Sequence, residues 1–262
     1  MDQNLSNLTL TAIYAVLQAG EILRRGFGTN YEIFAKPGHQ NFVTEFDRLA
    51  EESIINLIRS RFPEHSILAE ESGYSNHIED SILWIIDPLD GTTNFARHLP
   101  CFTISIAAYH KNEGLCGVIY QPMTNELFIA EKGKGAYLNG KRIHTSTTKN
   151  LRESLIIAAL PYENKFEPEE TLILLYELNH TGATIRNFGS AALSLAYVAS
   201  GKADALWMHK LYTWDIAAGK ILIEEAGGIV CLTNSENNFL HPAEVIASNS
   251  KIYSVFSDFL HY

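Results

Sequence analysis

Two carboxylates lie close together at Asp87 and Asp90, in the stretch WIIDPLDGTTNF that covers residues 84–95. Pro88 between them lacks an N–H group and fixes its own φ angle, so the chain must leave the preceding apolar run in a defined turn. Both side chains can then converge on one ion. Carboxylate oxygens are the ligands that hard cations such as Mg²⁺ and Mn²⁺ prefer, so the pattern predicts an all-oxygen metal site.

The residues after Asp90 suit a phosphate group. Gly91 allows the backbone to turn closely, and Thr92 and Thr93 supply hydroxyl groups. A helix that begins at about Asn94 would direct its first N–H groups toward an anion. The sequence therefore predicts a phosphate position between the metal and the start of a helix.

Two further acids are candidates for the same metal site. Glu70 ends a predicted strand, and Asp215 begins a predicted helix. Two metal ions about 4 Å apart would polarise a phosphoryl oxygen, generate a hydroxide nucleophile and stabilise the leaving alkoxide. Phosphoester hydrolysis is the reaction that this set of residues suits.

Taken singly, each of these residues also has an ordinary structural interpretation. Asp, Pro, Gly and Thr are common turn formers, and the pair Glu70 and Glu71 can be a solvated edge. Asp47 can be the third residue of a capping box that Thr44 begins, and Asp215 can lie favourably against a helix dipole. The site prediction therefore depends on all of them occurring together.

Other motifs fail on spacing. An EF-hand loop that began at Asp87 would need oxygen ligands where Leu89 and Gly91 stand, and a glutamate where His98 stands. The glycines of EKGKGAYLNG, residues 131–140, lack the third glycine of a dinucleotide fingerprint and lead into a hairpin. The ten histidines are scattered and include no H-E-x-x-H, and no C-x-x-C pair occurs, so zinc is disfavoured.

Composition limits the class of protein. The chain has 262 residues, three widely spaced cysteines and a formal net charge of −10. The longest basic run is Arg24-Arg25, so the sequence lacks an electrostatic footprint for nucleic acid. A disulfide framework, an export signal and an apolar run of about 18 residues are all missing, which predicts a cytoplasmic protein that does not span a membrane.

Periodicity and turn residues predict the elements that must position these side chains. The middle of the chain has the pattern of an antiparallel sheet, with a hairpin turn at Asn139-Gly140, and the second half alternates strands and helices. We expect an N-terminal α+β half over residues 1–148 that carries most metal ligands, and a C-terminal α/β half over 149–262 that completes the active site. The predicted helices are 5–25, 44–63, 167–180, 189–201 and 214–228. The predicted strands are 65–72, 82–87, 103–110, 116–122, 126–133, 154–161, 183–187, 204–208 and 228–232. Residues 30–41 are predicted as a loop.

Seven matched segments together resemble the Mg²⁺-dependent, lithium-sensitive inositol monophosphatase family, within the superfamily that includes fructose-1,6-bisphosphatases. In order they are Lys36, NFVTEFD, FPEHSILAEES, WIIDPLDGTTNF, GAYLNGKRI, FGSAALSLAYVASGKAD and WDIAAGKILIEEAGG. They extend from residue 36 to residue 228, and their occurrence in this order is highly specific. The resemblance implies a layered αβαβα sandwich with two β-sheets, usually in a homodimer, that binds two or three Mg²⁺ ions.

The resemblance also implies metal ligands. Glu70, Asp87 and the Leu89 carbonyl would hold the first ion. Asp87, Asp90 and Asp215 would hold the second, and Glu70 with water molecules would hold a weaker third.

Further roles follow from the resemblance for the chemistry around the metals. Thr92, hydrogen-bonded to Asp47, would help to orient and activate the metal-bound water. The N–H groups of Gly91 and Thr92 would hold the phosphate, and Lys36 would belong to a mobile lid near the metals.

The substrate side is implied in the same way. Gly189, Ser190 and Ala191 would line the leaving-group side, together with Asp90.

Two positions depart from the family pattern. Inositol-selective members carry a glutamate seven residues before the last metal-binding aspartate, where it contacts sugar hydroxyls, and here that position is Met208. A thioether cannot replace a carboxylate as acceptor, although His209 or Lys210 could contribute if the local alignment shifts. Asn41 stands where some relatives have aspartate, which predicts weaker binding of a third metal.

The leading hypothesis is a Mg²⁺-dependent phosphomonoesterase that hydrolyses inositol monophosphate or a similar small polyol or sugar phosphate. Within the fold, fructose bisphosphate, adenosine 3′,5′-bisphosphate and histidinol phosphate are alternative substrates. DGTTNF looks more like the inositol and fructose branches, because the nucleotide and histidinol branches tend to carry lysine at the Thr93 position. A non-catalytic regulator that binds a partner such as an RNA polymerase component is the alternative of another class. A haloacid-dehalogenase-type phosphatase is disfavoured, because its aspartates are two residues apart.

Overall fold

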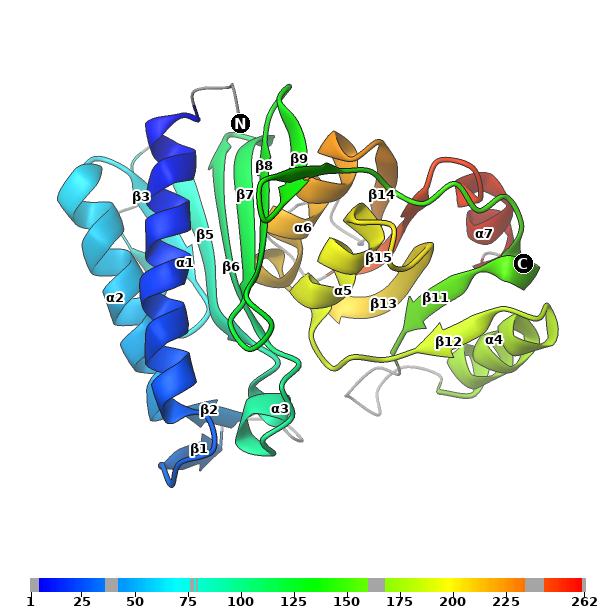
Figure 1. Cartoon of the computed structure of the whole chain (residues 1–262), viewed down its shortest axis with the longest axis horizontal. Coiled ribbons are helices and arrows are strands. Elements are labelled where there is room, and N and C mark those ends of the chain that lie inside the picture. Colours follow the sequence, from blue (N-terminus) through cyan, green and yellow to red (C-terminus); the bar gives the residue numbers. More distant parts are fainter. Residues whose placement is uncertain are drawn as a thin grey trace.

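Five layers build the molecule in the computed structural model, and Figure 1 shows them from one side to the other. Helices cover one face of a large sheet, two helices lie between this sheet and a smaller one, and two further helices cover the far face of the smaller sheet. The structure describes residues 5–35, 42–75, 78, 80–159, 168–233 and 243–260. The predicted αβαβα sandwich with two β-sheets is confirmed.

The first two layers come from the N-terminal part of the chain. Helices α1 (Asn7–Gly26) and α2 (Glu45–Arg61) pack on an eight-stranded sheet of order β10-β9-β8-β7-β6-β5-β3-β4. All its neighbouring strands pair antiparallel except β3 and β5. The strands are β3 (Ser66–Ala69), β4 (Gly73–Ser75), β5 (Ile82–Asp90), β6 (Thr103–His110), β7 (Glu113–Gln121), β8 (Glu126–Glu131), β9 (Gly135–Leu138) and β10 (Lys141–Ile143), and a separate pair is formed by β1 (Ile33–Ala35) and β2 (Phe42–Thr44).

The other three layers come from the C-terminal part. Helices α5 (Ala191–Ala199) and α6 (Thr213–Glu225) lie between the sheets, and their buried side chains form the largest core cluster. The second sheet has the order β12-β11-β13-β15-β14 and is covered by α4 and α7. Its strands are β11 (Leu155–Ala158), β12 (Thr184–Arg186), β13 (Ala205–Leu211), β14 (Gly228–Thr233) and β15 (Ala243–Asn249). The remaining helices of the described chain are α3 (Thr92–Ala96), α4 (Pro168–His180), α7 (Tyr253–Leu260) and the short 3₁₀ helix η1 (Leu151–Glu153).

Capping residues set where the first two helices begin. The Ser6 hydroxyl accepts a hydrogen bond from the Thr9 N–H at the start of α1. At the start of α2, Thr44 and Asp47 form the predicted capping box, because the Asp47 carboxylate accepts the Thr44 N–H at 2.8 Å. These bonds satisfy N–H groups that have no partner within the helix. The capping interpretation of Asp47 is confirmed.

The observed elements differ from the predicted ones in several places. The predicted loop over 30–41 contains β1, and the sequence predicted neither β15 nor α7. The helix expected from about Asn94 begins at Thr92, because Gly91 adopts φ 98° and turns the chain into it two residues earlier. Among the described residues, no helix has the length and apolar character needed to cross a membrane.

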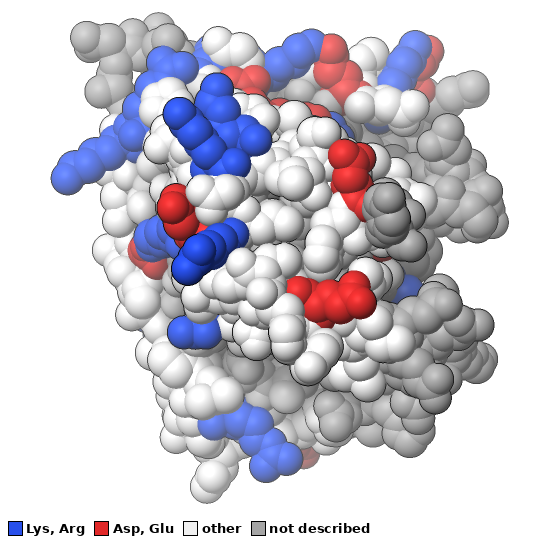
Figure 2. All heavy atoms as spheres, turned by 90° about the vertical axis from the view of Figure 1, so that its right-hand side faces the viewer, with Lys and Arg blue, Asp and Glu red and all other residues white. Residues whose placement is uncertain are grey.

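Figure 2 shows the face on the side of α4, β12 and α7. Lysine and arginine side chains gather toward one part of this face, several acidic side chains lie beside them, and other acidic side chains lie alone among uncharged areas. On α4, Leu172, Ile173 and Tyr176 are exposed. The described part of this face therefore carries mixed charge.

Candidate active site

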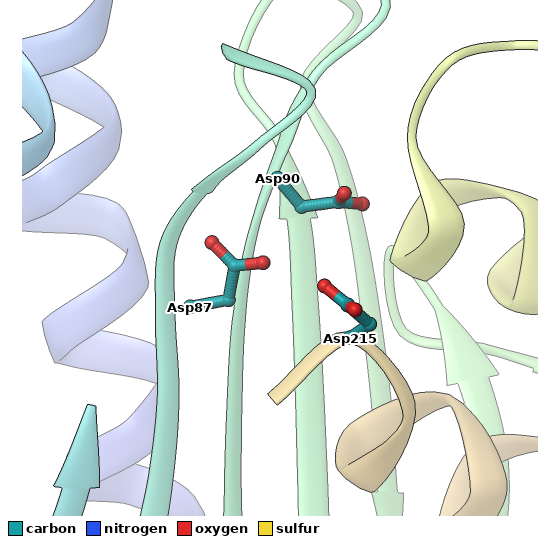
Figure 3. A group of neighbouring side chains, drawn as sticks. All are labelled: Asp87, Asp90 and Asp215. Carbon is teal, nitrogen blue, oxygen red and sulfur yellow. The ribbon is translucent and has the colours of Figure 1, made fainter. Parts of the chain in front are cut away.

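A β-bulge at the end of β5 brings two of the predicted ligands to one side of the sheet. Asp87 pairs with Ser105 and Asp90 pairs with Thr103, so three steps along β5 match two steps along β6. In a regular strand, residues three apart point to opposite faces, and the extra residue of a bulge removes this alternation. Asp87 and Asp90 consequently point toward the same place, as Figure 3 shows.

The third ligand comes from the other half of the chain. Asp215 lies in the first turn of α6, where its carboxylate accepts the Tyr212 N–H at 2.7 Å. One oxygen from each of Asp87, Asp90 and Asp215 lies within 4.8 Å of the others, and Figure 3 shows the three carboxylates pointing toward one another. The structure thus brings together three predicted metal ligands that are separated by up to 128 positions in the chain.

The electrostatics of Asp87 favour a cation. Burial, and then the charges of Glu70, Asp90 and Asp215, raise the pKa of Asp87 well above its ordinary value. The Leu89 N–H donates to Asp87 at 3.0 Å and opposes this shift only in part. A bound divalent cation would remove the repulsion among these carboxylates and stabilise their charged form, so the donor set fits a hard metal ion.

Asp90 has a different environment, although it is also buried. Its carboxylate accepts hydrogen bonds from the Ser190 hydroxyl, the Ala192 N–H at 2.7 Å and the Ala191 N–H at 3.2 Å. The Thr103 hydroxyl is a fourth donor at 3.4 Å. Burial raises the pKa of Asp90, and these hydrogen bonds lower it. The start of α5 therefore holds the Asp90 side chain in one orientation.

Beside the carboxylates lies the predicted pair of Asp47 and Thr92. The Thr92 hydroxyl lies 3.1 Å from Asp47 Oδ1 and 3.0 Å from the Leu89 carbonyl oxygen, both acceptors. Burial raises the pKa of Asp47 to about 7, hydrogen bonds from Thr44 oppose the shift, and the charges of Glu71 and Glu70 add to it. The predicted contact between Thr92 and Asp47 is present.

Glu70 lies next to these groups without belonging to the closest cluster. It directly follows β3, the parallel neighbour of β5, and its N–H donates to the Ile86 carbonyl at 3.1 Å. Its charge contributes to the raised pKa of both Asp87 and Asp47. The charge of Glu70 thus acts on both a metal-ligand candidate and the Asp47–Thr92 pair, and its role as a metal ligand stays a prediction.

Gly91 has no room for a side chain. A Cβ atom there would lie 3.0 Å from the Cys101 carbonyl oxygen and 3.2 Å from that of Gly189, and its φ of 98° is a conformation that side chains disfavour. The backbone of the predicted phosphate turn therefore packs directly against Gly189 and against Cys101 and Phe102.

The predicted leaving-group residues fall into two groups. Ser190 and Ala191 bond to Asp90, and Gly189 packs on the turn at Gly91. Met208 differs, because its side chain is 4% exposed and lies in the core cluster between the sheets. The structure gives Met208 a packing role, and contact with a substrate stays a prediction for it. Lys36 and Asn41 lie outside the described residues.

Sequence reasoning missed several residues that support the site. Thr103 and Ala192 hydrogen-bond to Asp90, and the Asn94 side chain connects two loops that flank the turn. Thr103 begins a predicted strand, so it could have been noticed as a β6 residue opposite the end of β5. Asn94 was considered only for its backbone.

Comparison with known proteins agrees with this geometry. The model of the inositol monophosphatase family matches residues 4–258. The chain belongs to the inositol monophosphatase family. It is 39% identical to Nus factor SuhB of Escherichia coli over 92% of this chain and 91% of that protein. It is 37% identical to inositol-1-monophosphatase of Caulobacter vibrioides over 92% and 96% of the two chains.

A solved structure of a similar protein superposes closely. The structure of extragenic suppressor protein suhB from Bartonella henselae matches with a TM-score of 0.91 and 35% identity, covering 97% of this chain and 98% of the other. The five-layer arrangement described above is therefore that of an inositol monophosphatase family member.

Proposed function

We propose that the protein is a Mg²⁺-dependent phosphomonoesterase that hydrolyses inositol monophosphate or a similar small polyol or sugar phosphate. The observation that supports this most directly is the convergence of Asp87, Asp90 and Asp215 beside the hydrogen-bonded pair of Asp47 and Thr92. Family membership and the similarity to a protein named inositol-1-monophosphatase support the same reaction class.

The metal ligands would come from both halves of the chain. Asp87, Asp90 and Asp215, with Glu70 and the Leu89 carbonyl, would hold two or three Mg²⁺ ions. When bound, these ions would supply polarisation of a phosphoryl oxygen, activation of a water molecule and stabilisation of the leaving alkoxide.

The groups around the ligands would orient the attacking water. In the metal-free protein the pKa of Asp47 is about 7, so its carboxyl changes protonation state close to neutral pH. Its contact with Thr92 fixes the direction of that hydroxyl, which would orient the attacking water. Lys36 is proposed, from the family resemblance alone, to lie near the metals in a lid.

The phosphate and the leaving alcohol would occupy the space bordered by the phosphate turn and the start of α5. The N–H groups of Gly91 and Thr92 would bind phosphate oxygens, because the first N–H groups of a helix have no partner within it. Gly189, Ser190 and Ala191 would lie on the side of the leaving alcohol.

The proposal is tested by phosphate release from inositol monophosphate and a panel of sugar phosphates, with Mg²⁺ and with EDTA. We expect turnover that requires Mg²⁺, and a loss of at least about a hundredfold in Asp90→Asn and Asp215→Asn, since losing a metal ligand removes several kcal/mol of transition-state stabilisation. Asp258→Asn is the matched control, because Asp258 is an aspartate on α7 that lies outside the carboxylate cluster. Full activity in either ligand variant would overturn the assignment.

A role as a Nus factor is a second candidate, favoured by the name of the Escherichia coli relative. It would use the fold to bind a partner such as an RNA polymerase component. Binding of purified RNA polymerase in EDTA, retained in Asp90→Asn and without turnover across the substrate panel, would favour this role over catalysis.

Further properties proposed from the resemblance are a homodimer, sensitivity to lithium and a cytoplasmic location. Sedimentation at several concentrations tests the dimer, and inhibition by millimolar Li⁺ in the Mg²⁺ assay tests lithium sensitivity. Fructose-1,6-bisphosphate and adenosine 3′,5′-bisphosphate belong in the same substrate panel, because they are the alternative substrates of this fold.

A further inference from the structure

The Asn94 side chain connects two segments that are far apart in sequence. Its Nδ2 group donates to the Cys101 carbonyl at 2.6 Å and to the Phe188 carbonyl at 2.7 Å. Cys101 belongs to the loop between α3 and β6, whereas Phe188 precedes α5 in the C-terminal half. Asn94 itself lies in α3 and is 9% exposed. One buried amide therefore links the phosphate turn to both loops beside it.

The chemistry of this link requires an amide. Both partners are carbonyl oxygens, so the group between them must donate two hydrogen bonds, and the NH₂ group of asparagine does so. A carboxylate at this place would face two acceptors, and an apolar side chain would leave two carbonyl groups without these donors. Leaving buried acceptors unsatisfied destabilises the folded protein.

Gly189 makes the contact tight from the other side. A Cβ atom on Gly189 would lie 2.9 Å from Asn94 Nδ2, and the glycine has φ 68°. The Gly189 carbonyl in turn lies against the place where a Gly91 side chain would be. The segment from Phe188 to Ser190 therefore contacts the phosphate turn through the Gly189 backbone and the Asn94 amide.

The same segment leads directly into the groups that hold Asp90. Ser190 is the N-cap of α5, and its hydroxyl bonds to both the Leu193 N–H and Asp90. A movement of Phe188 relative to α3 would shift this cap and the N–H groups of Ala191 and Ala192. The position of Asn94 is thus coupled by contact to the side of the site proposed for the leaving alcohol.

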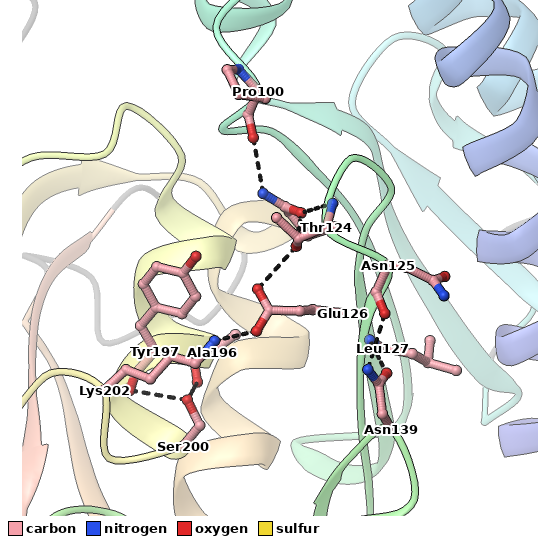
Figure 4. Close-up of polar contacts among 11 residues, drawn as sticks. Pro100, Thr124, Asn125, Glu126, Leu127, Asn139, Ala196, Tyr197, Ser200 and Lys202 are labelled. Carbon is pink, nitrogen blue, oxygen red and sulfur yellow. Dashed lines mark hydrogen bonds and ion pairs between the residues drawn. The ribbon is translucent and has the colours of Figure 1, made fainter.

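A second set of contacts joins the same two loops around the outside, and Figure 4 shows most of it. The Phe188 ring packs edge-on against Tyr197, and Lys202 lies over the Tyr197 ring and pairs with Glu126. This rim is partly exposed, and exposed ion pairs contribute little to stability.

The outer contacts end on the loop that Asn94 also holds. Glu126 accepts the Thr124 hydroxyl, and Thr124 donates to Gln121. Gln121 donates to the Pro100 carbonyl at 2.9 Å. The buried Asn94 bonds are the direct route between Cys101 and Phe188, whereas the rim is longer and weaker.

We propose that Asn94 is a positioning residue that sets the leaving-group side of the site, by fixing residues 187–190 against the phosphate turn. The inference rests on the proposed phosphatase function. It adds that selectivity for the alcohol depends on an amide that touches neither metal ligand nor substrate.

The test compares two substrates that share the phosphate and differ in the leaving group, inositol monophosphate and p-nitrophenyl phosphate. Asn94→Ala and Asn94→Asp should lower kcat/KM for inositol monophosphate at least about tenfold, mostly through KM, because the polyol needs the surface formed by residues 187–190. The aryl ester should change less than about threefold, because its leaving group is a stable anion that needs little orientation. The increase in Tm on adding Mg²⁺ should be retained in both variants, since the three carboxylates remain.

Gly189→Ala tests the same contact while residue 94 stays asparagine. It should reproduce the selective loss, because its Cβ would press on the amide. Gly133→Ala is the matched control, since Gly133 also has positive φ, 74°, but has nothing within 4 Å of an added Cβ. Its ratio of activities on the two substrates should equal that of the wild type.

Gln121→Glu separates this role from simple support of the α3–β6 loop. It removes the donor to Pro100 and leaves the bond from Asn94 to Phe188 intact, so the ratio of activities should stay within about twofold of wild type. Equal losses on both substrates in the Asn94 variants, or a selective loss in Gln121→Glu, would overturn the proposal. If the wild type hydrolyses neither ester, the proposed function fails, which is a different result from an unselective Asn94 variant.

Discussion

The two sides of the site differ in what they supply. The edge of the eight-stranded sheet supplies negative charge, because Asp87, Asp90 and Asp47 all lie there or on the neighbouring helix α2. The C-terminal half supplies one carboxylate, Asp215, and a set of donors at the start of α5. The first side concentrates charge that repels itself, and the second orients that charge.

Asp87 and Asp90 show the difference within one strand. Both are buried at the end of β5, yet the pKa of Asp87 is raised by burial and by three other acids, whereas four donors oppose the shift at Asp90. Burial alone therefore does not define a ligand. Before any metal binds, hydrogen-bond donors, mainly from the C-terminal half, determine how far the charge of a buried carboxylate is compensated.

The largest effect should come from replacing Asp87. In Asp87→Asn, phosphatase activity should fall at least about a hundredfold because a metal ligand is lost. The Tm in EDTA should rise, because the repulsion from Glu70, Asp90 and Asp215 is removed. Calorimetry in EDTA measures the change.

Asp90→Asn is the matched variant for this comparison. It should lose activity equally but gain less stability in EDTA than Asp87→Asn, because its four donors stabilise the charged form and offset part of the cost of burial. Equal Tm changes in the two variants would show that the two sides do not differ as described.

Met208→Glu should act on stability, although the sequence suggested it as a switch of specificity. The Met208 side chain is 4% exposed and lies in the core cluster between the two sheets. A charge buried there without a partner should lower Tm by about 5 °C or more, as thermal unfolding can measure. Met208→Leu controls for the loss of the thioether, and should keep the wild-type Tm within about 2 °C. A sharp rise in inositol phosphate turnover with unchanged Tm would show instead that Met208 faces the substrate.

The metal-free protein should lose stability as pH rises toward neutral. The folded-state pKa of Asp47 is about 7 against an ordinary 3.8, so the folded state binds the proton more tightly than the unfolded state. The resulting stability is complete below about pH 4 and is lost as the pH rises through 7. Asp87 and Asp90 act in the same direction.

Asp47→Asn should therefore make the free energy of unfolding in EDTA depend less on pH between 4 and 7. Urea titrations at several pH values measure this slope. An unchanged slope would mean that Asp47 does not carry the shifted proton.

Ser190→Ala and Thr103→Ala should give smaller effects, which are losses of Mg²⁺ affinity. The loss should be larger in Ser190→Ala than in Thr103→Ala. Both remove a donor to Asp90, but Ser190 makes the closer contact and Thr103 lies at 3.4 Å. Residues that orient a metal ligand typically contribute tenfold or more, so we expect about tenfold loss of Mg²⁺ affinity for Ser190→Ala and about twofold for Thr103→Ala. Isothermal titration with Mg²⁺ measures both, and the reverse order would contradict the hydrogen-bond geometry.

The sequence predicted the charged side far better than the orienting side. Asp87, Asp90 and Thr92 lie within six residues, so local turn chemistry was enough to place them together. The bond between Asp90 and Ala192 joins residues 102 positions apart, and no local pattern encodes it. The αβαβα layers followed from the family resemblance and the order of elements.

The elements that were missed are those whose stability comes from tertiary pairing. β15 lies between β13 and β14 in the second sheet, so both its edges are paired. Asn94 is similar, because its importance comes from carbonyl groups on Cys101 and Phe188 and not from its neighbours in the chain.

The bulge in β5 contains a backbone group whose role amino-acid substitutions do not reveal. Pro88 and Leu89 have no partner in the register with β6, and the Leu89 carbonyl, predicted as a metal ligand, accepts a hydrogen bond from the Thr92 hydroxyl. That carbonyl belongs to the main chain, so no codon change at position 89 can delete it. A complete substitution scan would report Leu89 as a packing residue, and only a deletion that restores the regular register would reveal what the backbone contributes there.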